Sequence, residues 1–161
     1  ECPTIEFAAP KDWQPVDDAI RKIQEYSWLL FTGVNAVDHF FSRADALGVR
    51  CNIPIAVVGA ATAARLEHWG YRASLSPAQF SAEGLLAAFT PDLTGNRILF
   101  PRAETAREIL PETLERRGAK VDLVVVYRTV RSDSAAQFPL ILRNQHIDFV
   151  VFTSEIGRAH V

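Results

Sequence analysis

Short, almost continuously apolar runs alternate along this chain with longer amphipathic segments, and this alternation restricts the possible folds more than any other feature. The apolar runs are rich in β-branched and aromatic residues, which favours strands covered on both faces. The predicted strands are residues 4–7, 28–32, 53–58, 97–100, 121–127 and 148–153.

Helices are predicted between these runs. Apolar residues at three- and four-residue steps from Val34 to Leu47 give one apolar helical face. Similar patterns predict helices over residues 60–69, 81–89 and 104–117, and a weaker one over 16–26. Gly48, Gly70 and Gly118 each follow such a segment, as expected of glycine in a left-handed C-terminal cap. The sequence therefore predicts an α/β fold, a parallel sheet flanked by helices in a flavodoxin-like or Rossmann-like three-layer arrangement, with the strand order left open.

Composition and missing motifs exclude several classes of protein. The 161 residues carry 17 Lys and Arg against 19 Asp and Glu, a net charge of -2, so the basic footprint of a nucleic-acid binder is missing. No apolar run approaches the ~20 residues of a membrane span. Cys2 and Cys51 have no metal-ligand spacing, and His39, His68 and His146 are scattered, so no metal site is predicted. The chain also lacks dinucleotide, P-loop and serine-hydrolase signatures.

Small, hydroxyl-bearing and cationic residues follow the predicted strands, where open α/β sheets bind their ligands. Several of them also begin helices, whose N–H groups and dipoles favour anions. This pattern predicts a cleft for carboxylates or phosphates. The candidate residues are Thr32, Gly33, Asn35, Gly59, Thr62, Arg102 and Tyr127.

Two of these residues have competing interpretations. Arg102 could grip a carboxylate with its planar guanidinium, or it could brace a strand-to-helix turn. Tyr127 could donate a proton or a hydrogen bond, or it could be a partly buried tyrosine with an exposed hydroxyl.

An internal repeat indicates two similar domains. YSWLLFTG (26–33) and HIDFVVFTS (146–154) are both apolar strands ending in Phe-Thr and a small residue. The chain has no methionine and begins at Glu1. We interpret it as a fragment and the last heptapeptide, 155–161, as a cloning or sequencing scar.

Taken in order, seven phrases resemble uroporphyrinogen-III synthases over nearly the whole chain up to Ser154. The phrases are PTIEF (3–7), WLLFTGVNAV (28–37), IAVVGAATA (55–63), SAEGLL (81–86), RILFPRA (97–103), YRTV (127–130) and IDFVVFTS (147–154).

The resemblance implies a protein of two α/β domains joined by a two-stranded connector. Residues 1–7 and 127–130 would supply the connector strands, consistent with the unusually long apolar run that ends at Val130. Residues 8–126 would form one complete domain, and residues 131–154 would begin the return to the other.

The implied reaction is the cyclisation of hydroxymethylbilane to uroporphyrinogen III, with loss of water and inversion of the last pyrrole ring, and without metal or organic cofactor. Tyr127 matches the family's proposed proton donor. Gly33 departs from the family's usual serine, whereas Ser154 keeps it in the second copy. The expected protein is a cytoplasmic monomer whose partner is a linear tetrapyrrole polycarboxylate, with no nucleic-acid or membrane partner. The substrate-binding residues implied are Thr32, Gly33, Asn35, Gly59, Thr62, Arg102, Thr153 and Ser154.

We expect this chain alone to be inactive, because the cleft needs both domains. One alternative is a related domain that binds a tetrapyrrole or another anion within a regulator without turning it over. Another is a flavodoxin-like signalling or sugar-phosphate-binding domain, which the lack of clustered acids at the strand ends disfavours.

Overall fold

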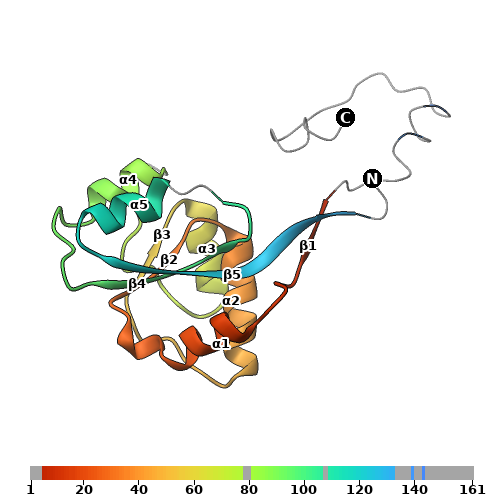
Figure 1. Cartoon of the computed structure of the whole chain (residues 1–161), viewed down its shortest axis with the longest axis horizontal. Coiled ribbons are helices and arrows are strands. Elements are labelled where there is room, and N and C mark those ends of the chain that lie inside the picture. Colours follow the sequence, from red (N-terminus) through yellow and green to blue (C-terminus); the bar gives the residue numbers. More distant parts are fainter. Residues whose placement is uncertain (1–4, 78–80, 107–108, 133–138, 140–142, 144–161) are drawn as a thin grey trace. The chain divides into compact units, whose positions relative to one another are not determined.

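A computed structural model describes residues 5–77, 81–106, 109–132, 139 and 143 (Figure 1). The chain divides into two compact units, residues 9–128 and residues 1–8 with 129–161. The larger unit holds nearly all the described secondary structure. In the smaller one, β1 (Ile5–Ala8) contributes Glu6, whose carboxylate accepts a hydrogen bond from the Ser132 hydroxyl.

The strands form a sheet with the order β1-β5-β4-β2-β3. The pairings β2–β3, β2–β4 and β4–β5 are all parallel, so the carboxyl ends of these four strands share one edge. Their near-continuous apolar character reflects helices on both faces. Their bounds are β2 (Trp28–Phe31), β3 (Ile55–Val57), β4 (Arg97–Ala103) and β5 (Lys120–Arg131).

Helices cover both faces of the sheet in the larger unit (Figure 1). One face packs against α1 (Gln14–Arg21), α2 (Val34–Ala46) and α3 (Ala60–His68). The other packs against α4 (Ala82–Ala88) and α5 (Ile109–Arg116). The predicted parallel α/β sheet with flanking helices is confirmed.

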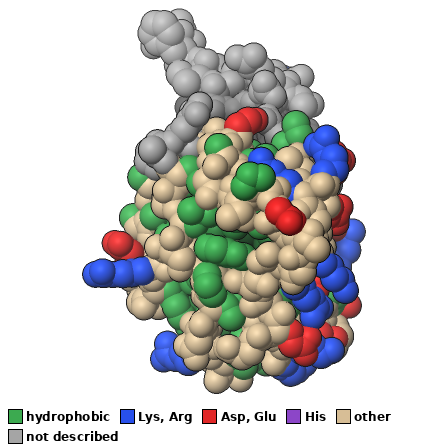
Figure 2. Space-filling model, turned by 90° about the vertical axis from the view of Figure 1, so that its left-hand side faces the viewer, with side chains coloured by type: hydrophobic (Ala, Val, Ile, Leu, Met, Phe, Trp, Pro, Cys, Tyr) green, Lys and Arg blue, Asp and Glu red, His purple; other side chains and the backbone are tan. Residues whose placement is uncertain are grey.

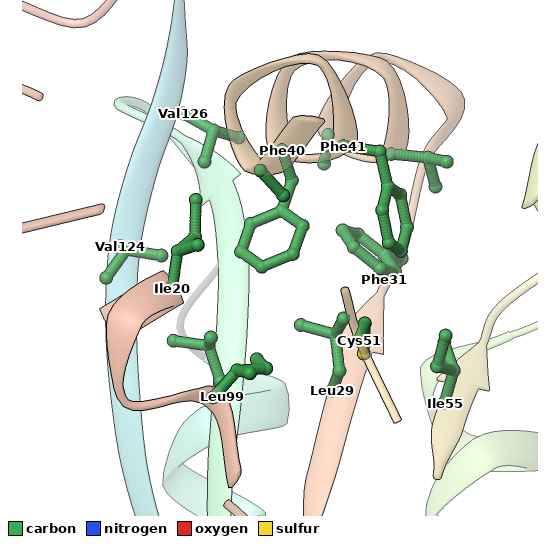
Figure 3. Packing of buried hydrophobic residues seen from close by; sticks show 14 of the residues in the cluster. Ile20, Leu29, Phe31, Phe40, Phe41, Cys51, Ile55, Leu99, Val124 and Val126 are labelled. Atoms are coloured by element: carbon green, nitrogen blue, oxygen red, sulfur yellow. The ribbon is translucent and has the colours of Figure 1, made fainter. Parts of the chain in front are cut away.

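Three phenylalanine rings lie together among aliphatic side chains in the core on the α2 face (Figure 3). Phe40 and Phe41 project from α2 towards the sheet, and each ring centroid lies 5.7 Å from that of Phe31 on β2. All three are at most 2% exposed. Burying a side chain of this size contributes about 2–3 kcal/mol before entropy is counted, so α2 is held firmly against the sheet.

Some element boundaries differ from those predicted. The predicted helix over 104–117 corresponds to α5 (Ile109–Arg116), and residues 104–106 are not helical. They differ because β4 continues to Ala103 and the Glu104 amide donates to the Tyr127 carbonyl, which holds the chain against β5. The segment predicted as one helix over 16–26 is α1 followed by a short 3₁₀ turn (Ile23–Glu25). The predicted strand 148–153 and the 155–161 segment lie outside the described residues.

The surface mixes charges of both signs. On the face shown in Figure 2, acidic and basic side chains lie side by side along one margin, and hydrophobic side chains gather nearer the middle.

Among the described residues, no helix has the length and apolarity needed to cross a bilayer, and no cluster of three His, Cys, Asp or Glu side chains could hold a metal ion.

Candidate functional site

The strand order changes direction at β2, next to the carboxyl edge of the sheet. From β2 the chain passes through α2 to β3 on one side, and then returns to β4 on the other side of β2. Where successive connections leave in opposite directions, the carboxyl ends of the neighbouring strands frame the usual ligand site of an α/β sheet. The candidate residues follow β2 and β3, lie near the end of β4, or lie on β5 opposite the end of β4.

At the end of β2, the chain turns directly into α2. Thr32 is exposed, and Gly33 is the N-cap of the helix in an extended conformation, with φ -166°. A Cβ built on Gly33 would meet no atom within 4 Å. Gly33 begins a 13-residue helix, and the N-terminus of such a helix favours an anion.

At the end of β3, Gly59 is the N-cap of α3 with φ 92°, a left-handed conformation that favours glycine. Thr62 in the first turn of α3 is only 3% exposed. Thr62 is therefore buried, whereas Gly59 is partly exposed in the turn that precedes α3.

Arg102, near the end of β4, is 6% exposed. Its guanidinium carbon lies 5.9 Å from the ring centroid of Phe100, which belongs to the core on the α4 and α5 face. Arg102 therefore lies on the face opposite α2. Such burial agrees with bracing of the strand end, and its role as a carboxylate ligand stays a prediction.

Tyr127 lies on the α2 face because β5 contains a bulge. Arg102 pairs with Val125 and Ala103 with Tyr127, so Val126 is an additional residue between two partners. Regular alternation would place Val126 and Tyr127 on opposite faces. Instead both pack against the core of the α2 face, with Val126 fully buried and Tyr127 partly buried. The bulge re-aims the phenol towards α2.

Two α2 side chains contact this phenol. The His39 and Tyr127 rings stack at 15°, with centroids 5.4 Å apart. The Asn35 side chain also interacts with the phenol and lowers its pKa. Asn35 and His39 are four residues apart, so they occupy one face of the helix. Together they hold the ring from two positions along α2.

Burial governs the electrostatics of this group. It raises the pKa of Tyr127 above its ordinary value, and the Asn35 interaction opposes the shift. A contact that lowers a phenol pKa favours the phenolate. Burial also lowers the pKa of His39, against a smaller effect of Asp38. At neutral pH the pair is an uncharged imidazole on a protonated phenol.

The structure thus brings Asn35 and Tyr127 together and adds His39, which sequence analysis did not select. Its signal was present in the four-residue spacing from Asn35, but the partner of that face could not be known before β5 was placed. Thr153 and Ser154 lie outside the described residues.

A shallow depression of about 480 Å³ lies near the amino-terminal ends of β4 and β5, away from these residues. Asp122 there accepts hydrogen bonds from the Tyr26 hydroxyl and from Arg97, which also pairs with Glu25. The polar groups are committed to one another, and this network ties the start of β5 to β4 and to the segment before β2.

The order of these elements and residues matches a known family. The profile of the uroporphyrinogen-III synthase HemD family matches residues 1–160. The chain belongs to the uroporphyrinogen-III synthase family. It is 37% identical over 162 residues to the uroporphyrinogen-III synthase of Synechococcus elongatus, covering 96% of this chain and 60% of that protein. It is 32% identical over 160 residues to a putative uroporphyrinogen-III synthase of Methanothermobacter thermautotrophicus, covering 96% of this chain and 63% of that protein. The chain spans about three fifths of the length of these curated relatives.

Solved uroporphyrinogen-III synthases share the fold. The wild-type enzyme of the extremely thermophilic bacterium Thermus thermophilus superposes with a TM-score of 0.62 at 18% identity, over 88% of this chain and 57% of that chain. The Helicobacter pylori structure gives a TM-score of 0.54 at 20% identity, over 80% of this chain and 55% of that chain. The family resemblance inferred from the seven sequence phrases is therefore confirmed.

Proposed function

We propose that the protein carrying this sequence cyclises hydroxymethylbilane to uroporphyrinogen III, with loss of water and inversion of the last pyrrole ring. The observation that carries the proposal is the family match over residues 1–160, together with relatives named for this activity. The chain spans only part of those relatives, so the activity is proposed for a protein of the family's full length.

Tyr127 is the proposed general acid. As the C–O bond of the substrate's hydroxymethyl group breaks, the phenol proton passes to the departing oxygen and water leaves. The pyrrole electrons form the reactive azafulvene, and closure of the macrocycle then releases a proton that can return to the phenolate. A partly buried tyrosine with a raised pKa is protonated at neutral pH, as an acid must be. The Asn35 interaction lowers the pKa of the phenol and so favours the phenolate that remains.

The substrate carboxylates are proposed to bind along the carboxyl edge of the sheet. The N-termini of α2 at Gly33 and of α3 at Gly59 offer N–H groups, and Thr32 offers an exposed hydroxyl. Asn35, Thr62 and Arg102 complete the proposed set from the described residues. Thr153 and Ser154 are proposed as equivalents in the second copy of the Phe-Thr-small sequence.

The domain organisation belongs to the same proposal. Residues 8–126 would be one complete flavodoxin-like domain, residues 1–7 and 127–130 the connector, and residues 131–154 the return into the other domain. The compact unit of residues 9–128 and the strand order β3-β2-β4-β5 support this division. We further propose a cytoplasmic monomer that acts without metal or organic cofactor.

The test supplies hydroxymethylbilane to the full-length gene product and separates type I from type III uroporphyrinogen. Type III product above the uncatalysed level supports the proposal, and type I product alone contradicts it. Tetrapyrrole binding without turnover would favour the binding domain of a regulator. The 161-residue chain, assayed in parallel, is expected to give no type III product, because about two fifths of the family's length is missing from it.

A further inference from the structure

We propose that His39 is a positioning residue for Tyr127, which holds the phenol in its productive orientation by ring stacking. The inference rests on the proposed function for its catalytic consequence and on the stacked geometry for its physical basis. It assigns a task to a histidine that no sequence motif identifies.

The bulge in β5 creates the need for such a residue. By turning Tyr127 to the face already occupied by Val126, it places two consecutive side chains over the same helix. A phenol at the margin of a core can rotate about two side-chain bonds. The imidazole of His39 stacks on the phenol at an interplanar angle of 15°, and this contact limits rotation of the phenol ring out of its plane.

Asn35 supplies the complementary restraint. Asn35 interacts with the phenol group, whereas His39 stacks on the ring. Because both side chains belong to the rigid helix α2, their spacing is set by one helical turn. The helix is itself locked by Phe40 and Phe41, which are at most 2% exposed. Tyr127, the proposed general acid, is thus positioned by contacts from a helix rather than from a loop. Helices hold side chains in place more precisely than loops do.

The imidazole acts here through its shape and not through proton transfer. A flat aromatic replacement should therefore preserve its effect, and an aliphatic one should not. This expectation separates a positioning residue from a catalytic one, because a proton-transfer role would be lost in both variants.

The experiment compares His39→Phe, His39→Leu and His39→Ala in the full-length protein. We expect kcat to fall about tenfold in His39→Leu and His39→Ala, with KM changed less than about twofold, because misplacing a reacting group costs rate more than binding. His39→Phe should recover kcat to within about threefold of wild type. The matched control is His68→Ala, on the exposed surface of α3, which should leave both constants unchanged.

Loss of kcat in all three variants would overturn ring stacking as the role of His39, and so would full activity in His39→Leu and His39→Ala. Circular dichroism of each variant checks that it folds. Because two aliphatic variants are compared, the test still stands if one of them does not fold. If wild type forms no type III product, the proposed function fails, and the positioning is judged separately.

That separate measurement is the NMR spectrum of the chain with 13C-labelled tyrosine, in which Tyr127→Phe assigns the Tyr127 ring signals. His39→Leu should shift these signals, because an adjacent parallel ring shields them, and His39→Phe should shift them much less. Signals that stay at the wild-type position in His39→Leu would overturn the inference.

Discussion

Two hydrogen bonds join the carboxylate of Asp17 to the guanidinium of Arg43, from Nε to Oδ1 at 2.7 Å and from Nη2 to Oδ2 at 2.6 Å. The pair links α1 to α2, and the Arg43 guanidinium also lies 5.0 Å from the centroid of a Trp13 ring. Asp17 is 7% exposed, so its charge depends on this partner. The bridge fixes the helix that carries Asn35 and His39.

The Asp17 bridge predicts a loss of stability in acid. The Arg43 hydrogen bonds hold the pKa of Asp17 below 3.8, its ordinary value. A depressed carboxyl pKa contributes stability above the unfolded value, and this contribution is lost as pH falls through the folded value. Asp17→Asn should lower Tm by roughly 5–10 °C at pH 7, and the difference should shrink below about pH 4. Thermal denaturation of both proteins across pH 2–7 measures this, and a difference independent of pH would contradict it.

Tyr26 predicts a loss of stability in alkali. Burial, and then the hydrogen bond to Asp122, raise the pKa of Tyr26 from 10.0 to about 12. A raised phenol pKa contributes stability that is complete below pH 10 and falls as pH rises from 10 to 12. Tyr26→Phe should therefore show a shallower alkaline decline in Tm than wild type. Asp122→Asn, which removes the neighbouring charge, should do the same. Identical slopes in the three proteins would count against the assignment.

Tyr127→Phe should lower kcat for type III product by at least about 100-fold, the usual contribution of a general acid. The ring and its stacking on His39 remain, so Tm should change by only a few degrees. Tyr26→Phe is the matched control, because it also deletes a buried phenol oxygen but lies away from the candidate site, beside the depression. We expect that control to lose stability and to keep its activity. Comparable kcat in wild type and Tyr127→Phe would remove Tyr127 from the mechanism.

The two N-cap glycines should respond differently to serine. Gly33 has an extended φ and open space around its Cβ position, so Gly33→Ser should gain a few tenths of a kcal/mol as a helix cap. Gly59 has φ 92°, where a side chain is strained, and Gly59→Ser should cost about 1–2 kcal/mol. Urea denaturation compares the two variants with wild type. The same sign of change at both positions would refute the distinction.

The larger elements can be located from the amino-acid sequence because their signals are local. Hydrophobic period and terminal glycines suffice to place α2 and α3, and apolar runs place β2 and β4. The start of α5 was misplaced because its boundary depends on a contact with β5, where the Glu104 amide meets the Tyr127 carbonyl. Such a contact leaves no trace in the pattern of residues 104–108.

The candidate site was predictable only in part, for a similar reason. Thr32 and Gly33 follow β2 directly and could be chosen by position. The direction of Tyr127 depends on a bulge that adds one residue relative to β4, and alternation alone predicts the opposite face. His39 could not be selected until that direction was known.

The stacked rings of His39 and Tyr127 also have a consequence for folding kinetics. They belong to an early helix and to the last strand of the larger unit, so the chain must close a long loop before they meet. The stack can form only after β5 has docked beside β4. A signal from the Tyr127 ring therefore reports this long-range contact of the larger unit rather than the formation of α2 alone.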